Sequence, residues 1–351
     1  MNDSAELPAA LHGRQLRRGI VRLGLFAAVV VVIIVAVPGL GSIRSRLAHG
    51  DPAWLVVAGL LRLASALSYV VTFRAVFAPR MSRRLSYRIA MSEVGLNALV
   101  PAGGAGGLAI GGWLLHRRGM PTARVLERSA EFFVFTSAFN VGAVAVFGWL
   151  GTAGVLATHA SLLLSLVPAL AASALIAAAL AAIPRIGSLQ ARQRNRRMHS
   201  WRWWVLDGVV MLGTGARGAL NLFRERDPRA LCGGAGYLLF DIATLWAAVR
   251  AFHGDPVLPA LVMAYLVGQL AGEIPIPGGI GVVDGGLIGA LILYGFPVTL
   301  ATTGSLAYRA IALAVPTLFG GLAAFLLTRC VRGTNRQPTA QVISNQLGPP
   351  G

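Results

Sequence analysis

Long apolar runs separated by short arginine-bearing segments make up most of the chain. A run of about twenty apolar residues is long enough to cross the hydrocarbon core of a bilayer as a helix. The pattern predicts crossing helices at 21–40, 53–78, 129–151, 161–183, 231–252 and 299–327. Two further apolar stretches, 89–115 and 259–295, are interrupted by glycine and proline. We therefore expect an all-α, polytopic integral membrane protein with about seven to eight transmembrane helices plus re-entrant or broken segments.

Composition agrees with a membrane protein and excludes a nucleic-acid partner. The chain is 56% hydrophobic and 13% charged, whereas soluble domains carry roughly 25% charged residues. Its 31 basic residues are all arginine, and most of them flank the apolar runs, which is typical of cytoplasmic loops and anionic-lipid contact. Two cysteines provide neither a disulfide scaffold nor metal-ligand spacing. We expect no metal and no cofactor.

The distribution of arginine predicts the topology. We expect an uncleaved first span, both termini in the cytoplasm, and insertion in the cell (inner) membrane. A single transmembrane domain at 14–330 would lie between disordered tails at 1–13 and 331–351. Inside this domain, the pattern predicts a basic cytoplasmic loop at 184–204. The segment 205–227 is predicted to lie on or dip into the inner leaflet, with a solvated loop as the alternative.

The first broken segment, 89–115, has arginine clusters on both flanks. One crossing would put a cluster on the wrong side, and two crossings need roughly 40 residues. The segment therefore predicts a re-entrant hairpin that enters from the cytoplasm, with one kinked span as the alternative. Its centre is a poor helix and predicts unwound backbone beside a cavity; the residues concerned are Asn97, Pro101, Gly103 and Gly104.

The second broken segment, 259–295, is cut by Glu273 and then by Pro277, Gly278, Gly279 and Gly281. It predicts either two short spans that meet at a cytoplasmic loop or a hairpin that enters from outside. Similar proline and glycine spacing in the two segments favours an inverted repeat, the arrangement common around transport sites. Helix starts inside the membrane present free N–H groups, which suit a phosphate-bearing lipid headgroup.

Ionisable residues inside apolar segments are costly and are functional candidates by default. Seven lie within or at the ends of such segments: Arg62, Glu93, Asp241, Arg250, Glu273, Asp284 and Arg309. We assign Arg62 and Arg309 to phosphate binding, and Glu93, Glu273 and Asp284 to cation or proton coupling. The alternative is a structural ion pair, such as Asp284 with Arg309. Near a helix end, Glu127 and Glu131 are expected to pair with Arg128 or Arg124, and Arg250 is expected to reach toward the interface.

Two strings resemble a known family, the lysylphosphatidylglycerol synthase transmembrane (flippase-like) family. The first is Asn97-Ala-Leu-Val-Pro101-Ala-Gly-Gly, followed by Arg117-Arg118-Gly119 and Glu127-Arg128. The second is Pro277-Gly-Gly-Ile-Gly-Val-Val-Asp284, followed by Tyr308-Arg309 and Pro316. The resemblance covers about 20–330. The chain departs from it at Asp284, where members commonly carry Glu, and at Gly107-Leu108, where many carry a charged residue.

The resemblance implies translocation of an anionic or aminoacylated phospholipid, and the anion-binding helix starts would also suit a polyprenyl-phosphate lipid. Expected partners are membrane lipids and an envelope lipid-synthesis enzyme. We expect a standalone membrane domain without the soluble aminoacyltransferase, and hence no enzyme. Two other functions stay open. One is a membrane-embedded transferase or accessory in envelope lipid or glycolipid synthesis, and the other is a small-solute or ion secondary transporter.

Overall fold

A computed structural model describes residues 50–77, 82–99, 112, 116, 120–156, 161–185, 201–273 and 280–334. The predicted first span, the two tails, most of the basic loop and the centres of both broken segments lie outside these residues. Every regular element within them is helical. The elements are α3 (Pro52–Phe77), α4 (Arg83–Leu99), α6 (Thr122–Thr152), α7 (Leu162–Ala182), a 3-10 turn (Ile183–Arg185), α9 (Trp201–Glu225), α10 (Pro228–Arg250), α11 (Leu258–Glu273), α12 (Ile280–Leu293) and α13 (Val298–Thr334). The predicted all-α membrane fold is confirmed.

Five of these helices are long and apolar enough to cross a bilayer: α3, α6, α7, α10 and α13. Their apolar runs leave large side chains exposed on the outer surface, such as Leu60, Leu163 and Leu318, as expected where lipid replaces water as the solvent. Local signals set some helix ends. Asp227 accepts a hydrogen bond from the Arg229 amide, and Pro228 occupies the first turn of α10, where its missing N–H costs nothing.

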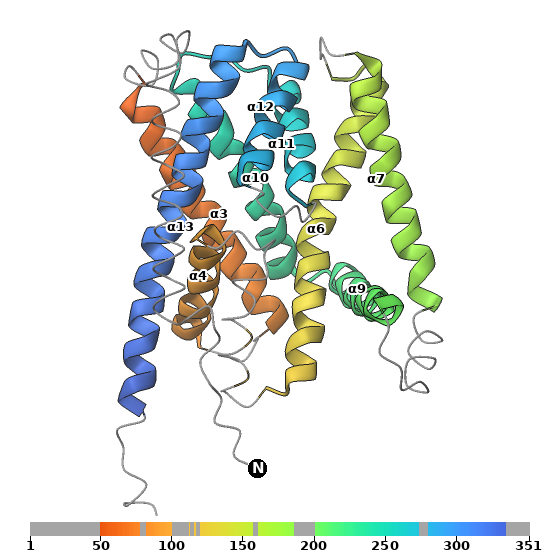
Figure 1. The fold of residues 1–351 in the computed structure, drawn as a ribbon, viewed down its shortest axis with the longest axis vertical. Coiled ribbons are helices and arrows are strands. Elements are labelled where there is room, and N and C mark those ends of the chain that lie inside the picture. Colours follow the sequence, from red (N-terminus) through yellow and green to blue (C-terminus); the bar gives the residue numbers. More distant parts are fainter. Residues whose placement is uncertain are drawn as a thin grey trace, which may run out of the picture.

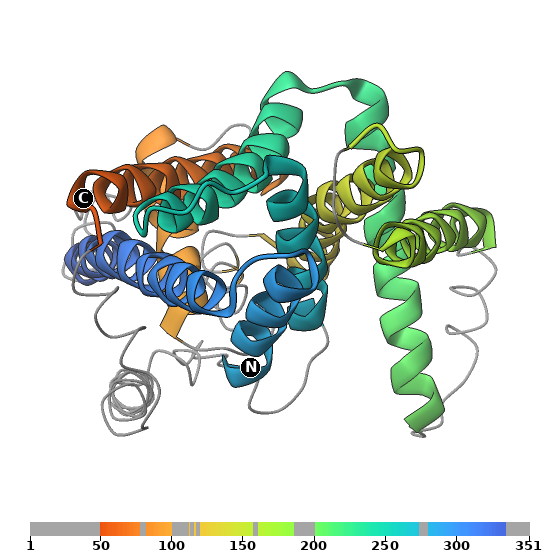
Figure 2. The same ribbon diagram turned by 90° about the horizontal axis from the view of Figure 1, so that it is seen from above.

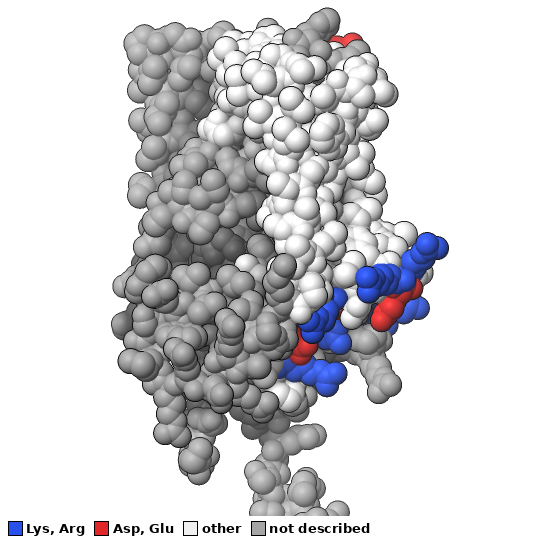
Figure 3. Space-filling view, turned by 90° about the vertical axis from the view of Figure 1, so that its right-hand side faces the viewer, with Lys and Arg blue, Asp and Glu red and all other residues white. Residues whose placement is uncertain are grey.

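Arginine gathers at one end of the helix bundle, which we call the Arg-rich end. There α3 ends, α6 and α10 begin, and α13 ends (Figure 1). Figure 3 shows arginine, with a few acidic side chains, on the lower part of one flank, and an acidic residue but no arginine among the described atoms above it. The described arginines near this end include Arg74, Arg83, Arg84, Arg88, Arg124, Arg128, Arg224, Arg226 and Arg229. The charge asymmetry predicted from the sequence is thus a property of the fold.

Two elements extend only part of the way through the bundle, from opposite ends. Helix α4 starts at the Arg-rich end and lies obliquely in that half (Figure 1). By Gly112 the chain has returned to the first turn of α6, because a Cβ on Gly112 would lie 3.0 Å from a methyl of Val125. This path agrees with the predicted hairpin on the arginine-bearing side. The turn itself lies outside the described residues.

Helices α11 and α12 form the second partial element, an antiparallel hairpin in the opposite half (Figure 1). Their 16 and 14 residues give lengths of about 24 and 21 Å, short of the roughly 30 Å hydrocarbon core. They pack closely, since a Cβ on Gly268 would lie 2.8 Å from the Leu287 Cα. Of the two alternatives for 259–295, this arrangement agrees with the hairpin that enters from outside, at the end opposite the arginines (Figure 1). The connection between the two helices lies outside the described residues.

Helix α9 lies across the Arg-rich end, seen end-on in Figure 1 and along its length in Figure 2. It packs on α6 where a Cβ on Gly215 would lie 2.6 Å from the Ala130 carbonyl carbon, and it leaves Met211 and Leu212 exposed. Two boundaries differ from prediction. Helix α9 begins at Trp201, inside the stretch predicted as loop 184–204, and α13 continues to Thr334, beyond the predicted domain end at 330.

Small residues bring the central helices into close contact. A Cβ on Gly233 of α10 would lie 2.4 Å from the Thr72 hydroxyl of α3, and one on Gly95 of α4 would lie 2.7 Å from the Gly320 Cα of α13. Packing between small residues is what holds helices together where lipid removes the hydrophobic driving force. The α3–α10 and α4–α13 contacts therefore fix the positions of the polar side chains described next.

Candidate functional site

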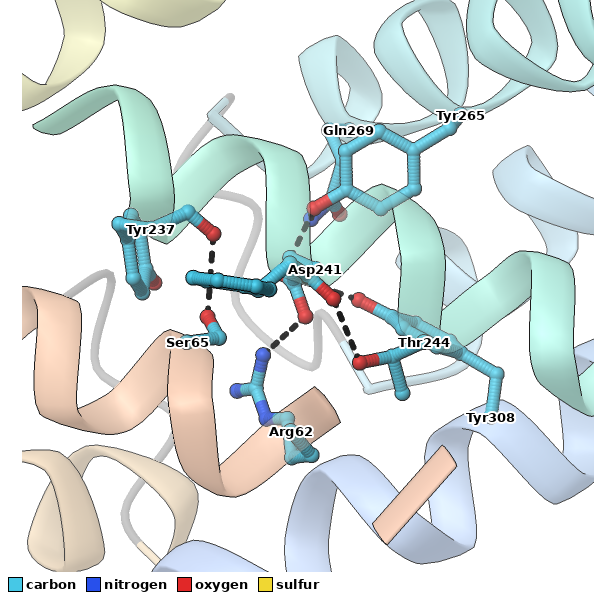
Figure 4. A network of polar contacts seen from close by, with 9 residues as sticks. Arg62, Ser65, Tyr237, Asp241, Thr244, Tyr265, Gln269 and Tyr308 are labelled. Atoms are coloured by element: carbon cyan, nitrogen blue, oxygen red, sulfur yellow. Dashed lines mark hydrogen bonds and ion pairs between the residues drawn. The ribbon is translucent and has the colours of Figure 1, made fainter. Parts of the chain in front are cut away.

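A buried ion pair joins α3 to α10. The Arg62 guanidinium donates from Nη1 to Oδ1 of Asp241 (Figure 4), and the two side chains are 13% and 6% exposed. Each charge alone would be expensive at membrane depth, and pairing removes much of that cost. Arg62 lies about 15 Å from the start of α3, and Asp241 about 14 Å from the end of α10, so the pair lies well inside both helices.

Two tyrosines complete the coordination of Asp241. Tyr265 of the α11 hairpin donates to Oδ2 at 2.7 Å, and Tyr308 of α13 donates to the same oxygen at 3.2 Å. Gln269, one turn after Tyr265, donates to the Tyr265 hydroxyl oxygen at 2.9 Å. Four helices, one of them in a half-length hairpin, therefore converge on one carboxylate (Figure 4). We call these five side chains the Asp241 cluster.

The Asp241 cluster has unused binding capacity on its cation. Nε of Arg62 is buried and has no hydrogen-bond partner among the described residues. Arg309 follows Tyr308 directly on α13 and is half-buried. A guanidinium with a spare donor, beside tyrosine hydroxyls that donate to an anion, is suited to bind a carboxylate or a phosphate.

A second buried carboxylate lies in the half nearer the Arg-rich end. Glu93 of α4 is completely buried, and its Oε1 accepts a hydrogen bond of 2.9 Å from the Tyr69 hydroxyl of α3. Tyr69 packs edge-on to Tyr237 of α10, with ring centroids 5.7 Å apart. Tyr237 lies one turn before Asp241, so the α3–α10 interface links Glu93 to the Asp241 cluster.

Other ionisable residues are paired away from these sites. Arg128 donates to Glu131 at 2.7 Å, which confirms the predicted pair near the start of α6. At the opposite end, Arg250 donates to the exposed Asp255 at 2.5 Å, over the rings of Trp54 and Trp246. Among the residues that the structure describes, no group of three His, Cys, Asp or Glu side chains could hold a metal ion.

The structure describes only part of the predicted site. Arg62, Glu93 and Arg309 are buried or half-buried as expected, and Asn97 is half-buried near the end of α4. Glu273 ends α11, while Gly281 and Asp284 lie in the first turns of α12. The structure does not describe the surroundings of these three residues. The remaining predicted site residues lie outside the described part of the chain: Pro101, Gly103, Gly104, Pro277, Gly278 and Gly279.

Sequence reasoning missed the residues that bind the carboxylates. Asp241 was recognised as a buried charge but received no role, and Tyr69, Tyr265 and Gln269 were not singled out. Tyr308 entered only as part of the second resemblance string. One signal was present: Tyr265 and Gln269 are spaced i, i+4 in an otherwise apolar helix, which places both on one face.

Comparison with known proteins gives one match. A family model described as lysylphosphatidylglycerol synthase TM region matches residues 20–320. That range includes all the described helices apart from the last turns of α13. A search of curated proteins found no match.

Proposed function

The chain belongs to the family of lysylphosphatidylglycerol synthase transmembrane regions, and on that premise we propose that it moves a lipid with an anionic headgroup between the two leaflets of a bilayer. Membership in this family supports a role for the chain, as a multi-pass membrane protein, in lipid synthesis or lipid flipping. The family name includes phosphatidylglycerol, whose headgroup carries a phosphodiester. The proposal assigns this chain the translocation step and a phosphate-bearing substrate.

The Asp241 cluster carries the proposal. A helix bundle that served only as a scaffold has no need of a charged pair and two tyrosines well inside its spans, because each ionisable group there is costly. The cluster also includes Tyr265, which belongs to a hairpin too short to cross the bilayer. Partial elements that enter from opposite ends are the usual surroundings of a transport site near the midplane.

The chemistry of the cluster suits anion exchange. Asp241 neutralises Arg62 while the site is empty, and both tyrosines donate to the same carboxylate. An arriving phosphodiester offers similar acceptor oxygens, so it competes with Asp241 for Arg62, whose Nε is unused. Loss of the Tyr265 hydrogen bond to Asp241 frees the α11 hairpin from α10. Substrate binding and hairpin movement are thereby linked.

The broken segments provide the rest of the path in this proposal. Backbone N–H groups around Pro101, Gly103 and Gly104, and around Pro277, Gly278, Gly279 and Gly281, would hold the phosphate on either side of the cluster. Asn97 and Arg309 would add side-chain donors. Glu273 and Asp284 are assigned to charge compensation. The acyl chains stay in the surrounding lipid, in contact with the apolar outer surface.

Reconstitution tests the proposal. Protein in phosphatidylcholine vesicles with a trace of headgroup-labelled fluorescent phosphatidylglycerol should equilibrate the label between leaflets, as measured by quenching of the outer-leaflet fluorescence with an impermeant reductant. The charge-neutral double variant Arg62→Gln/Asp241→Asn should slow this about tenfold or more, because a charge-assisted hydrogen bond contributes about 1.5–3 kcal/mol.

The matched control is Arg250→Gln/Asp255→Asn, which removes the other Arg–Asp pair, at the end of α10. It should leave the rate unchanged. The proposal fails if wild-type vesicles scramble neither labelled phosphatidylglycerol nor a labelled polyprenyl phosphate faster than protein-free vesicles. Uptake of a small anion by those same vesicles would then indicate a solute transporter.

A further inference from the structure

Glu93 differs from Asp241 in the hydrogen-bond and ion-pair partners of its carboxylate. Asp241 has a guanidinium and two hydroxyl donors. Glu93, which is wholly buried, accepts one hydrogen bond from Tyr69 at Oε1, and its Oε2 is buried with no partner among the described residues. The two carboxylates therefore differ in their described partners: Asp241 faces a guanidinium and two hydroxyl donors, whereas Glu93 faces a single hydroxyl donor.

Among the residues that the structure describes, the neighbours of Glu93 do not include a cation. Helix α4 packs against α3 and α13. From α3 comes the neutral hydroxyl of Tyr69, which lies against Tyr237 of α10. The arginines of α3, α4 and α13 whose side chains the structure describes are Arg62, Arg74, Arg83, Arg84, Arg88 and Arg309, and none of them forms an ion pair with Glu93. Phe132 packs edge-on to Tyr69, and Phe73 packs edge-on to Phe132.

The ligand that suits such a carboxylate is a proton. A buried anion with a single hydroxyl donor is strongly disfavoured, and binding a proton removes the charge. A metal ion requires several oxygen ligands, whereas the described surroundings supply the Glu93 carboxyl and one tyrosine hydroxyl. No water-sized space adjoins Oε2, since it is completely covered.

We infer that Glu93 binds and releases one proton in each translocation cycle, so that lipid movement is coupled to a proton gradient. The inference rests on the proposed function. A proton from water forms the O–H bond at Glu93, and the same proton returns to water when that bond breaks; no other bond changes. The proton is thus the coupling ion, and Glu93 is its carrier.

The position of Glu93 explains how a proton could act on the lipid site. Helix α4 leads directly into the first broken segment, and its Gly95 fixes it against Gly320 of α13. On α3, Tyr69 lies two turns after Arg62. Its ring contacts Tyr237, one turn before Asp241. A charge that appears at Glu93 therefore disturbs the α3–α4 contact, which is shared by the broken segment and the Asp241 cluster.

Infrared difference spectroscopy tests the proton site without transport. The difference between acid and alkaline spectra of the reconstituted protein should contain a carboxylic-acid C=O band from a buried group. Glu93→Gln should lose that band, and Tyr69→Phe should shift it, because the hydroxyl no longer donates to Oε1. The control Glu127→Gln, at an exposed position on α6, should retain it. A wild-type spectrum with no band that depends on Glu93 would overturn the inference.

Transport under a pH gradient tests the coupling. In vesicles with labelled phosphatidylglycerol, an imposed gradient should change the wild-type rate and the final distribution between leaflets, with proton uptake detected by an entrapped dye. Glu93→Gln should lose both responses and still allow downhill equilibration, while Glu127→Gln responds like wild type. If wild type moves lipid with no response to the gradient, the coupling is wrong and the proposed function stands. If the infrared band is present and no lipid moves, the proposed function is wrong and the proton site stands.

Discussion

At the residue scale, the two tyrosines on Asp241 differ in what depends on them. Tyr265 donates to Oδ2 at 2.7 Å and also accepts from Gln269, whereas Tyr308 donates to the same oxygen at 3.2 Å. Tyr265→Phe removes one hydrogen-bond donor from the buried Asp241 carboxylate and leaves the Gln269 amide without its acceptor. We expect it to destabilise the protein by about 1–2 kcal/mol, and Tyr308→Phe to destabilise it less.

Thermal unfolding in detergent measures this difference. Tyr87→Phe, at a half-buried position on α4 outside the cluster, is the control and should leave the midpoint unchanged. A Tyr265→Phe midpoint equal to that of the control would mean that Asp241 does not depend on this hydroxyl. The hairpin would then be held by its apolar contacts alone.

At the element scale, the α4–α13 contact depends on two facing glycines. A Cβ on Gly320 would lie 2.4 Å from the Met91 carbonyl oxygen and 2.5 Å from the Gly95 Cα, whereas a Cβ on Gly321 would meet nothing within 4 Å. Gly320→Ala should force the helices apart and cost about 1–3 kcal/mol. Gly321→Ala should be neutral or stabilising by up to about 1 kcal/mol, because alanine favours helix.

The pair of variants isolates packing from helix propensity, since the two positions are adjacent on α13. Unfolding midpoints of the two proteins in the same detergent give the comparison. Equal midpoints would show that α4 is not fixed by close backbone contact. In that case Glu93 could move without α13, which would remove one mechanical link between the proton site and the rest of the bundle.

The elements themselves were largely predictable from the sequence, and their partners were not. Apolar runs predicted the five long spans within a few residues, apart from the additional turns at the ends of α6 and α13, because length and hydrophobicity decide insertion. The direction of the α11–α12 hairpin could not be predicted, because no arginine lies within 259–295 to orient it. The two tyrosines that donate to Asp241 come from positions 24 and 67 residues further along the chain, and Arg62 comes from 179 residues before it. Only the packing of α3, α10, α11 and α13 brings them together.

At the scale of the whole molecule, the concentration of arginine at one end predicts the orientation of the protein. Segments rich in arginine stay on the cytoplasmic side, so the end where α6 and α10 begin should face the cytoplasm. Val155, after α6, marks the opposite end and is exposed, and Arg226, between α9 and α10, is exposed at the Arg-rich end. Single cysteines at these two positions, in a background without Cys232 and Cys330, report the orientation.

In intact cells, an impermeant maleimide should label Val155→Cys at once and Arg226→Cys only after the membrane is permeabilised. Labelling in the reverse order would place the Arg-rich end outside, and the hairpin would then enter from the cytoplasm. The orientation also determines which side of the membrane Glu93 lies nearer. With the Arg-rich end in the cytoplasm, Glu93 lies nearer the cytoplasm than the Asp241 cluster. A gradient-driven cycle requires that Glu93 take up its proton from one side of the membrane and release it to the other, and this orientation makes the cytoplasm the nearer side.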